Sequence, residues 1–97
     1  MTRAVGFRPE AEQEALDIQR WYQARQPGLG DECGAEVDGV VARITASPLL
    51  FPRVRGETRR AVLTRFPDAL YFRLTVESVV VLAVHGRQDP SRWHRRA

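Results

Sequence analysis

The spacing of apolar residues changes once along this chain, near Pro52, and that change limits the folds open to it. Before Pro52 the apolar residues recur every three or four positions, as they do on one face of an α-helix. After it they alternate with polar residues, as in a strand with one wet face. The sequence therefore predicts an α+β fold, with helices in the first half and an antiparallel sheet built mainly from the second.

Two helices are predicted in the first half. The first covers residues 10–25, where acidic residues cluster near the N-terminal end and the apolar positions are Ala11, Ala15, Ile18 and Tyr22. A proline and two glycines within Gln26–Gly30 end this helix in a sharp turn. The second helix is predicted from about Asp31 to Ala46, with apolar positions at Cys33, Val37, Val40, Val41 and Ile44. The two should form a hairpin.

Strands are predicted on both sides of this hairpin. Residues 3–7 form a short first strand, and residues 59–66 alternate as a strand with one side partly wet. Residues 69–76 alternate again, and residues 79–85 are apolar throughout, which suits a central strand. Glu77 and Ser78 should connect the last two strands, with the register open by about one residue. The predicted architecture is an N-terminal strand, a two-helix hairpin and a three-stranded antiparallel meander, with the helices on one sheet face.

Length and composition exclude several classes of protein. A chain of 97 residues allows a single domain, residues 1–97, with one modest core. No apolar run approaches the roughly 18 to 20 residues of a membrane span, and no export signal is visible, so a cytoplasmic location is expected. Cys33 cannot form an internal disulfide, and with only His85 and His94 beside it no metal site and no cofactor are expected.

The charges are unevenly distributed. All fifteen basic residues are arginine; residues 1–48 carry a net charge of −3 and residues 49–97 a net charge of +6. Each arginine is a planar, permanently charged group. The second half should therefore face a polyanion or an acidic partner.

Several short segments, in their order and spacing, resemble the RelE/ParE toxin superfamily over nearly the whole chain. They are Phe7–Ala11, Trp21-Tyr22, Pro27–Gly30, Arg65–Pro67 and Leu82–Arg87, followed by Asp89-Pro90 and Trp93. The resemblance implies an antiparallel sheet with a packed helical hairpin, and the toxin half of a type II toxin–antitoxin module, of the ParE-like or plasmid-stabilisation kind. It also implies a cognate antitoxin as partner, whose acidic, largely disordered segment wraps the toxin in a hetero-oligomer.

The superfamily has two activities. ParE-like members poison DNA gyrase by binding, whereas RelE-like members cleave ribosome-bound mRNA with basic residues and, in many members, a C-terminal Tyr. Here Trp93, six residues after Arg87, stands where RelE-like proteins have that Tyr, and an indole cannot act as a general base. Phe66-Pro67-Asp68 stands where they have a further Arg. Both departures favour ParE-like inhibition of gyrase.

The residues expected to bind the target or the antitoxin are aromatic or basic: Trp21, Tyr22, Arg53, Arg55, Arg59, Arg60, Arg65, Arg73, Arg87 and Trp93. A metal-independent mRNA interferase is the alternative, in which Arg60, Arg65 and Arg87 would neutralise the scissile phosphate and His85 would transfer protons. A third reading is an inactive toxin that only co-represses transcription with its antitoxin. A structural role also stays open for His85, Trp93, Trp21 and Tyr22, and Cys33 is expected to pack on its helix face.

Overall fold

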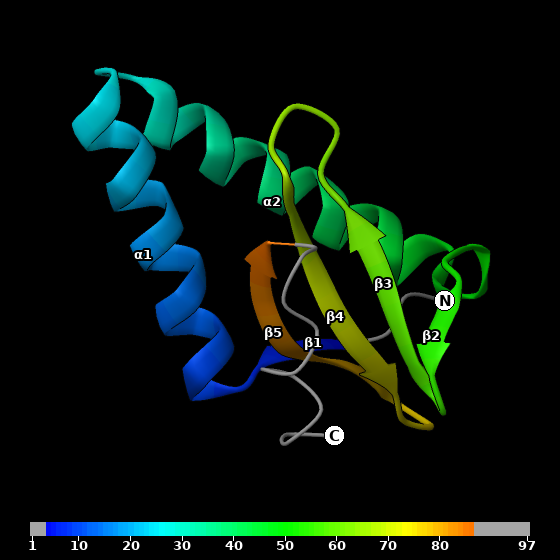
Figure 1. Cartoon of the computed structure of the whole chain (residues 1–97). Coiled ribbons are helices and arrows are strands. Elements are labelled where there is room, and N and C mark those ends of the chain that lie inside the picture. Colours follow the sequence, from blue (N-terminus) through cyan, green and yellow to red (C-terminus); the bar gives the residue numbers. More distant parts are fainter. Residues whose placement is uncertain (1–3, 87–97) are drawn as a thin grey trace.

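The computed structural model describes residues 4–86 (Figure 1). The elements are β1 (Ala4–Phe7), α1 (Pro9–Arg25), α2 (Leu29–Ala46), the 3-10 turn η1 (Pro48–Leu50), β2 (Arg53–Arg55), β3 (Thr58–Val62), β4 (Asp68–Leu74) and β5 (Ser78–Gly86). The strands form one five-stranded sheet in the order β1-β5-β4-β3-β2. The predicted α+β architecture is confirmed, with β1 parallel to β5 and the other neighbours antiparallel.

The core lies between the helical hairpin and one sheet face. The apolar positions predicted for the helices are buried there, including Ala11, Ala15, Cys33, Val37, Val40 and Ile44. They pack on buried strand residues, among them Leu70, Phe72, Val79, Val81 and Val84. Burial, with the nearby charges of Asp68 and Glu36, raises the pKa of the Cys33 thiol to about 11. Cys33 is therefore protonated at neutral pH and packs as a small apolar side chain, as predicted.

The first helix continues the edge of the sheet where β1 ends. β1 pairs only with the first half of β5, from Ser78 to Val81, and α1 begins two residues after Phe7. Beyond Val81, β5 has no strand partner on this side, and the buried Glu14 of α1 accepts the backbone N–H of Val84 through its Oε1 at 3.0 Å. A carboxylate thus satisfies a buried donor that the sheet leaves open.

No described helix is long and apolar enough to cross a membrane.

Three predicted boundaries are corrected. The second helix begins at Leu29 rather than near Asp31, after Gly28 makes the turn with a φ of 89°. The strand predicted over residues 59–66 ends at Val62, because the following residues form the loop into β4. The last hairpin turns at Val76 and Glu77 rather than at Glu77 and Ser78, since Thr75 N–H donates to the Ser78 carbonyl at 2.8 Å.

The structure also adds the strand β2, which makes the meander four-stranded. Its three residues are all exposed and include two arginines, so no alternation marks it in the sequence. It pairs with β3 at the edge of the sheet opposite β1.

Candidate functional site

Two of the predicted arginines lie on the sheet face that points away from the helices. Alternation along the strands sends Ala61, Leu70 and Phe72 into the core, so Arg60, Tyr71 and Arg73 lie on the opposite face. Arg60 is paired with Tyr71 across β3 and β4. We call this the distal sheet face and define it by Arg60, Tyr71, Arg73 and His85.

Arginines line two cavities on the distal sheet face. One, of about 230 Å³, is lined by Arg8, Arg73, Thr75, Val80 and Leu82. The other, of about 270 Å³, is lined by Arg55, Gly56, Glu57, Thr58 and Arg73. Arg73 contributes to both. Planar guanidinium groups around a cavity suit carboxylates and phosphates, so this face can bind an anionic partner.

The groups on this face that could transfer a proton are buried. His85 is 4% exposed and Tyr71 is 1% exposed, and their rings stack with centroids 4.9 Å apart. His85 Nδ1 lies 2.8 Å from the Gly86 carbonyl oxygen. Since a carbonyl only accepts, the Nδ1 of His85 carries the proton of this contact.

Arg59 belongs to the helix side of the sheet. It is paired with the core residue Phe72, and its Nη1 donates to the Phe51 carbonyl at 2.6 Å. Its guanidinium group thereby secures the segment that leads into β2. The structure separates it from its neighbour Arg60, although both were predicted to bind the same partner.

Arg53 and Arg55 lie at the β2 edge. Arg53 forms an exposed ion pair with Glu57 at 3.3 Å, of a kind that contributes little to stability. Arg55 is exposed and lines the cavity that Arg73 shares. The edge strand therefore extends the basic surface around Arg73.

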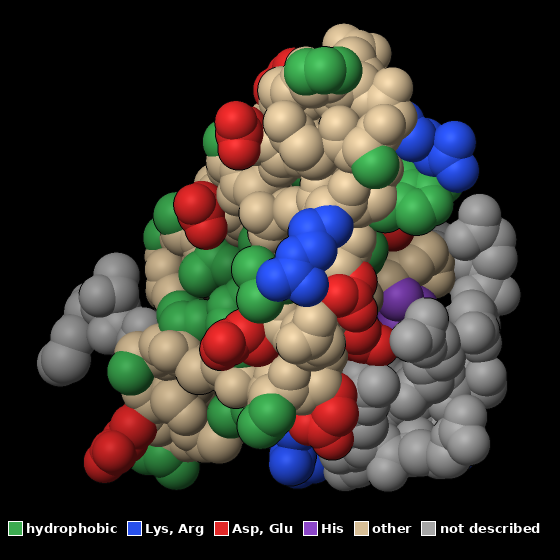
Figure 2. All heavy atoms as spheres, turned by 90° about the vertical axis from the view of Figure 1, so that its left-hand side faces the viewer, with side chains coloured by type: hydrophobic (Ala, Val, Ile, Leu, Met, Phe, Trp, Pro, Cys, Tyr) green, Lys and Arg blue, Asp and Glu red, His purple; other side chains and the backbone are tan. Residues whose placement is uncertain are grey.

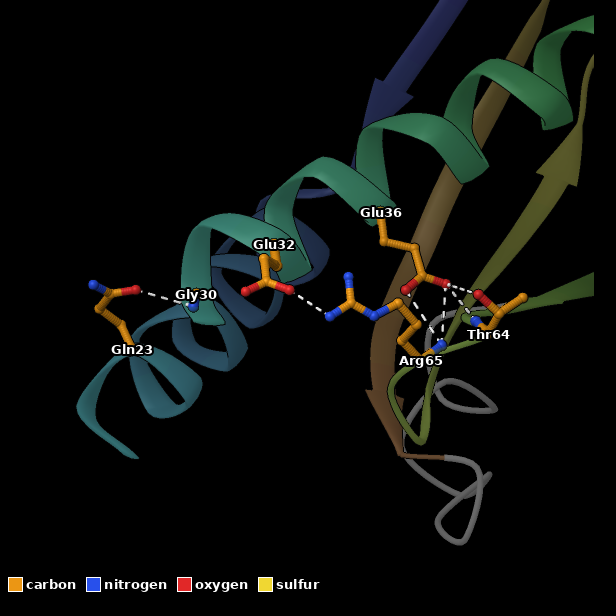
Figure 3. A network of polar contacts seen from close by, with 6 residues as sticks. All are labelled: Gln23, Gly30, Glu32, Glu36, Thr64 and Arg65. Carbon is orange, nitrogen blue, oxygen red and sulfur yellow. Dashed lines mark hydrogen bonds and ion pairs between the residues drawn. The ribbon is translucent and has the colours of Figure 1, made fainter. Parts of the chain in front are cut away.

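Arg65 is held on the β3–β4 loop by α2 (Figure 3). Its guanidinium group donates to Glu32, and that bond raises the pKa of Arg65 above its ordinary value. Its backbone N–H donates to Glu36, whose carboxylate also accepts the Thr64 backbone N–H and, at 2.8 Å, the Thr64 hydroxyl. The charge of Arg65 is thus matched by Glu32 and directed at α2.

Removing the charge of Glu36 should loosen this loop. Burial alone would raise the pKa of Glu36, but the hydrogen bonds from Thr64 and Arg65 lower it. Because the pKa of Glu36 is lower in the folded than in the unfolded protein, its carboxylate stabilises the fold at pH values above the unfolded-state pKa, about 4.3. This stabilisation is lost as the pH falls through the folded-state pKa. We expect Glu36→Gln to lower the free energy of unfolding by about 1 kcal/mol near neutrality. The loss should be smaller than for the same change at a buried carboxylate, because solvent screens the charges of this loop.

Urea unfolding at about pH 6 and at about pH 3 measures this effect, and the difference between wild type and variant should shrink at the lower pH. Asp38→Asn, an exposed carboxylate on the same helix, is the control and should leave stability nearly unchanged at both pH values. An equal loss for Glu36→Gln at both pH values would contradict the assignment.

The Phe66-Pro67-Asp68 segment is anchored to α1 through Tyr22. The Tyr22 ring lies 4.7 Å from that of Phe66, and its hydroxyl donates to Asp68 Oδ2 at 2.9 Å. Burial and this hydrogen bond raise the pKa of Tyr22 well above its ordinary value. Trp21 instead is 52% exposed, and the Arg25 guanidinium lies 3.7 Å from its ring centroid. Tyr22 therefore stabilises the core rim, whereas Trp21 is available to a partner.

Two predicted residues, Arg87 and Trp93, lie outside the described residues. Two residues were not among those predicted from the sequence: Tyr71 on the distal sheet face, and Arg8, which lines one of its cavities. The alternation of residues 69–76 already puts Tyr71 on the same face as Arg73, which was a usable signal. Nothing local marks Arg8, because its position depends on the parallel pairing of β1 with β5.

No family model matches the sequence, and no curated protein matches it. Solved structures do match the fold. A chain of the chromosomal ParDE toxin–antitoxin system from P. aeruginosa superposes with a TM-score of 0.77 at 15% identity, covering 88% of this chain and 96% of that one. A chain of the RelBE2 toxin–antitoxin complex from Mycobacterium tuberculosis gives 0.61 at 19% identity, covering 90% and 100%.

The E. coli toxin RelE, as a double arginine-to-alanine mutant in the free state, gives a TM-score of 0.69 at 15% identity, covering 100% of this chain and 95% of that one. All three matches span most of both chains, so the likeness includes the helical hairpin and the sheet together. This chain has the fold of the RelE/ParE toxins.

Proposed function

We propose that this protein is the toxin of a type II toxin–antitoxin module and that it acts in the cytoplasm by binding DNA gyrase, as ParE-like toxins do, rather than by cleaving RNA. The fold supports the first part, since the matching solved structures belong to the ParDE and RelBE toxin–antitoxin systems. Fold alone does not define an activity, so the second part depends on the chemistry of the surface.

The observation that carries the binding mechanism is the distal sheet face. It presents arginines around two cavities, while its proton-transfer candidates His85 and Tyr71 are buried. Arginine stabilises negative charge but moves protons poorly, because its pKa lies above about 12. The groups that an interferase would combine lie apart: Arg60 is on the distal sheet face, whereas Arg65 is paired with Glu32 of α2. This distribution favours an anion-binding surface over a hydrolytic site.

The antitoxin is proposed to add a second interaction at the β2 edge. Leu49, Leu50 and Val54 are 71%, 82% and 36% exposed, and Arg53 and Arg55 flank Val54. An acidic, disordered segment could bury these apolar side chains and pair with the arginines as it folds. The apolar contacts would supply affinity, and the charges would accelerate encounter and set specificity.

The decisive experiment expresses the wild-type chain without its antitoxin and compares two assays with the purified protein. We expect inhibition of gyrase-dependent supercoiling at stoichiometric concentrations, with ribosome-bound mRNA left intact. In-frame cuts in that mRNA, lost on Arg60→Ala, would replace the proposal with the interferase. Normal growth on induction together with normal supercoiling would instead indicate the inactive co-repressor.

A further inference from the structure

The distal sheet face carries a second cluster of buried residues. Ala69, Tyr71 and Ala83 are at most 1% exposed, and they form a cluster separate from the main core. His85 is paired with Ala69 across β4 and β5, and its ring stacks on that of Tyr71. We define Ala69, Tyr71, Ala83 and His85 as the aromatic patch.

The two helices do not account for the burial of the aromatic patch. Both helices pack on the opposite face, and Figure 1 shows α2 crossing behind β3 and β4. Every member of the patch comes from β4 or β5. Strand side chains stand roughly perpendicular to the sheet, so neighbouring strand residues shield an alanine but leave the outer end of a tyrosine ring open. The burial of Tyr71 therefore calls for a further segment over the patch.

The chain leaves β5 beside the aromatic patch. Gly86, the last residue of β5, directly follows His85, and residues 87–97 continue from it. An extended residue spans about 3.3 Å, so Trp93 can reach up to about 23 Å from Gly86, whereas Ala83 lies only about 10 Å back along β5. The C-terminal segment is therefore long enough to cover the patch.

The sequence of this segment suits an aromatic surface. Residues 87–97 contain one large apolar side chain, Trp93, among four arginines. They also contain Asp89-Pro90, a pair typical of the first two positions of a turn, which would reverse the chain after β5. An indole buries a large apolar area and stacks on other rings. The stacked rings of Tyr71 and His85 provide such a surface.

We propose that the aromatic patch is the docking surface for residues 87–97 of this chain, with the indole of Trp93 packed on the rings of Tyr71 and His85. Tyr71 and Arg73 are two positions apart on β4, so the docked segment would bring its arginines to the border of the arginine-lined cavities. Docking itself does not depend on the gyrase mechanism, and only the enlarged basic surface rests on that proposed function.

Two other arrangements are less favourable. A second copy placed symmetrically on the patch would bring the arginines of both distal sheet faces together, and like charges across an interface are costly. The positive charge of the segment alone would direct it to α1, whose acidic side chains are spread over the helix face seen in Figure 2. Exposed charge pairs contribute little, whereas the burial of an indole contributes more.

The first test is a nuclear Overhauser measurement on the full wild-type chain. We expect contacts between the indole protons of Trp93 and the ring protons of Tyr71 and His85. The rings of Tyr22 and Phe66, with centroids 4.7 Å apart, are the internal control. Contacts of Trp93 with α1 instead, or no contacts of Trp93 while the control pair is seen, would overturn the proposal.

The second test places a thiol in the aromatic patch through Ala83→Cys and follows its labelling rate. The native thiol, Cys33, is buried, and the parent chain measures its background. Adding Trp93→Ala should raise the labelling rate by at least about tenfold, because labelling follows the open fraction of the patch and the aromatic anchor is lost. Trp21→Ala, which removes an exposed tryptophan from α1, should leave the rate unchanged.

Equal labelling rates with Trp93→Ala and with Trp21→Ala would overturn the proposal. A rate that falls as the protein concentration rises would also overturn it, because a second copy would then cover the patch. The Overhauser measurement needs no substitution, so it decides the question if Ala83→Cys does not fold. Neither measurement uses gyrase or antitoxin, so the failure of docking and the failure of the proposed function are seen in separate assays.

Discussion

A Gly30→Ala variant is expected to lose about 3 kcal/mol of unfolding free energy, because helix packing leaves no space for a side chain at this position. A Cβ on Gly30 would lie 2.4 Å from the carbonyl oxygen of Gln19 and 2.8 Å from the Cβ of Gln23, both on α1. The first contact is with backbone and cannot be relieved by a rotamer change. The helices would have to separate, which also disturbs the 3.0 Å hydrogen bond from Gly30 N–H to Gln23 Oε1.

Gly39→Ala is the matched control on the same helix. A Cβ there meets nothing within 4 Å, so alanine should raise the unfolding free energy by up to about 1 kcal/mol through helix propensity alone. Urea unfolding of both variants should therefore shift the midpoint in opposite directions. A Gly30→Ala midpoint equal to that of wild type would show that the hairpin does not require this close approach.

The two glycines of the helical turn show what the sequence could and could not predict. Pro27, Gly28 and Gly30 were sufficient to predict where the first helix ends, because chain reversal is a local property. Only Gly28 makes the turn, with its φ of 89°, whereas Gly30 lies inside α2 and serves a contact with α1. A contact between helices has no local signature, so the start of α2 was misplaced.

The strands, too, include some that the sequence pattern predicted and one boundary that it could not predict. Residues 69–76 and 79–85 were recognisable because burial imposes a pattern on each strand. The end of β3 was not, because a carboxylate 28 residues away holds the loop that follows it. Alternation continues past Val62 in the sequence, but Glu36 binds the backbone of Thr64 and directs the chain away from the sheet.

The candidate surface was predictable by charge but not by position. A count of arginines treats Arg59 and Arg60 alike, although strand alternation puts them on opposite faces of the sheet, and only the pairing with β4 tells which face each one shares. Asp68 and His85, which line one cavity with Glu14 and Asp17, could not be linked to them by charge either, because they come from the half of the chain with a net positive charge. Tertiary pairing, rather than composition, brings them to Glu14 and Asp17 of α1.

Reversing the charge of the distal sheet face should have the largest effect on function. In the double variant Arg60→Glu and Arg73→Glu, the two central cations of this face become anions. Like charges across an interface cost several kcal/mol, so we expect the concentration that inhibits gyrase-dependent supercoiling to rise at least about a hundredfold. Growth inhibition on induction should disappear with it. Wild-type inhibition should also weaken as salt is raised, because salt screens the same attraction.

The control must change the net charge equally without touching the distal sheet face. Arg20→Glu with Arg43→Glu does so, since Arg20 is an exposed residue of α1 and Arg43 an exposed residue of α2. Circular dichroism and urea unfolding establish that both double variants remain folded. If the control loses inhibition as completely as the Arg60 and Arg73 variant does, then overall charge, and not the arginines around Tyr71, directs this protein to its target. If only the distal variant fails, the anion-binding surface is where the target is held.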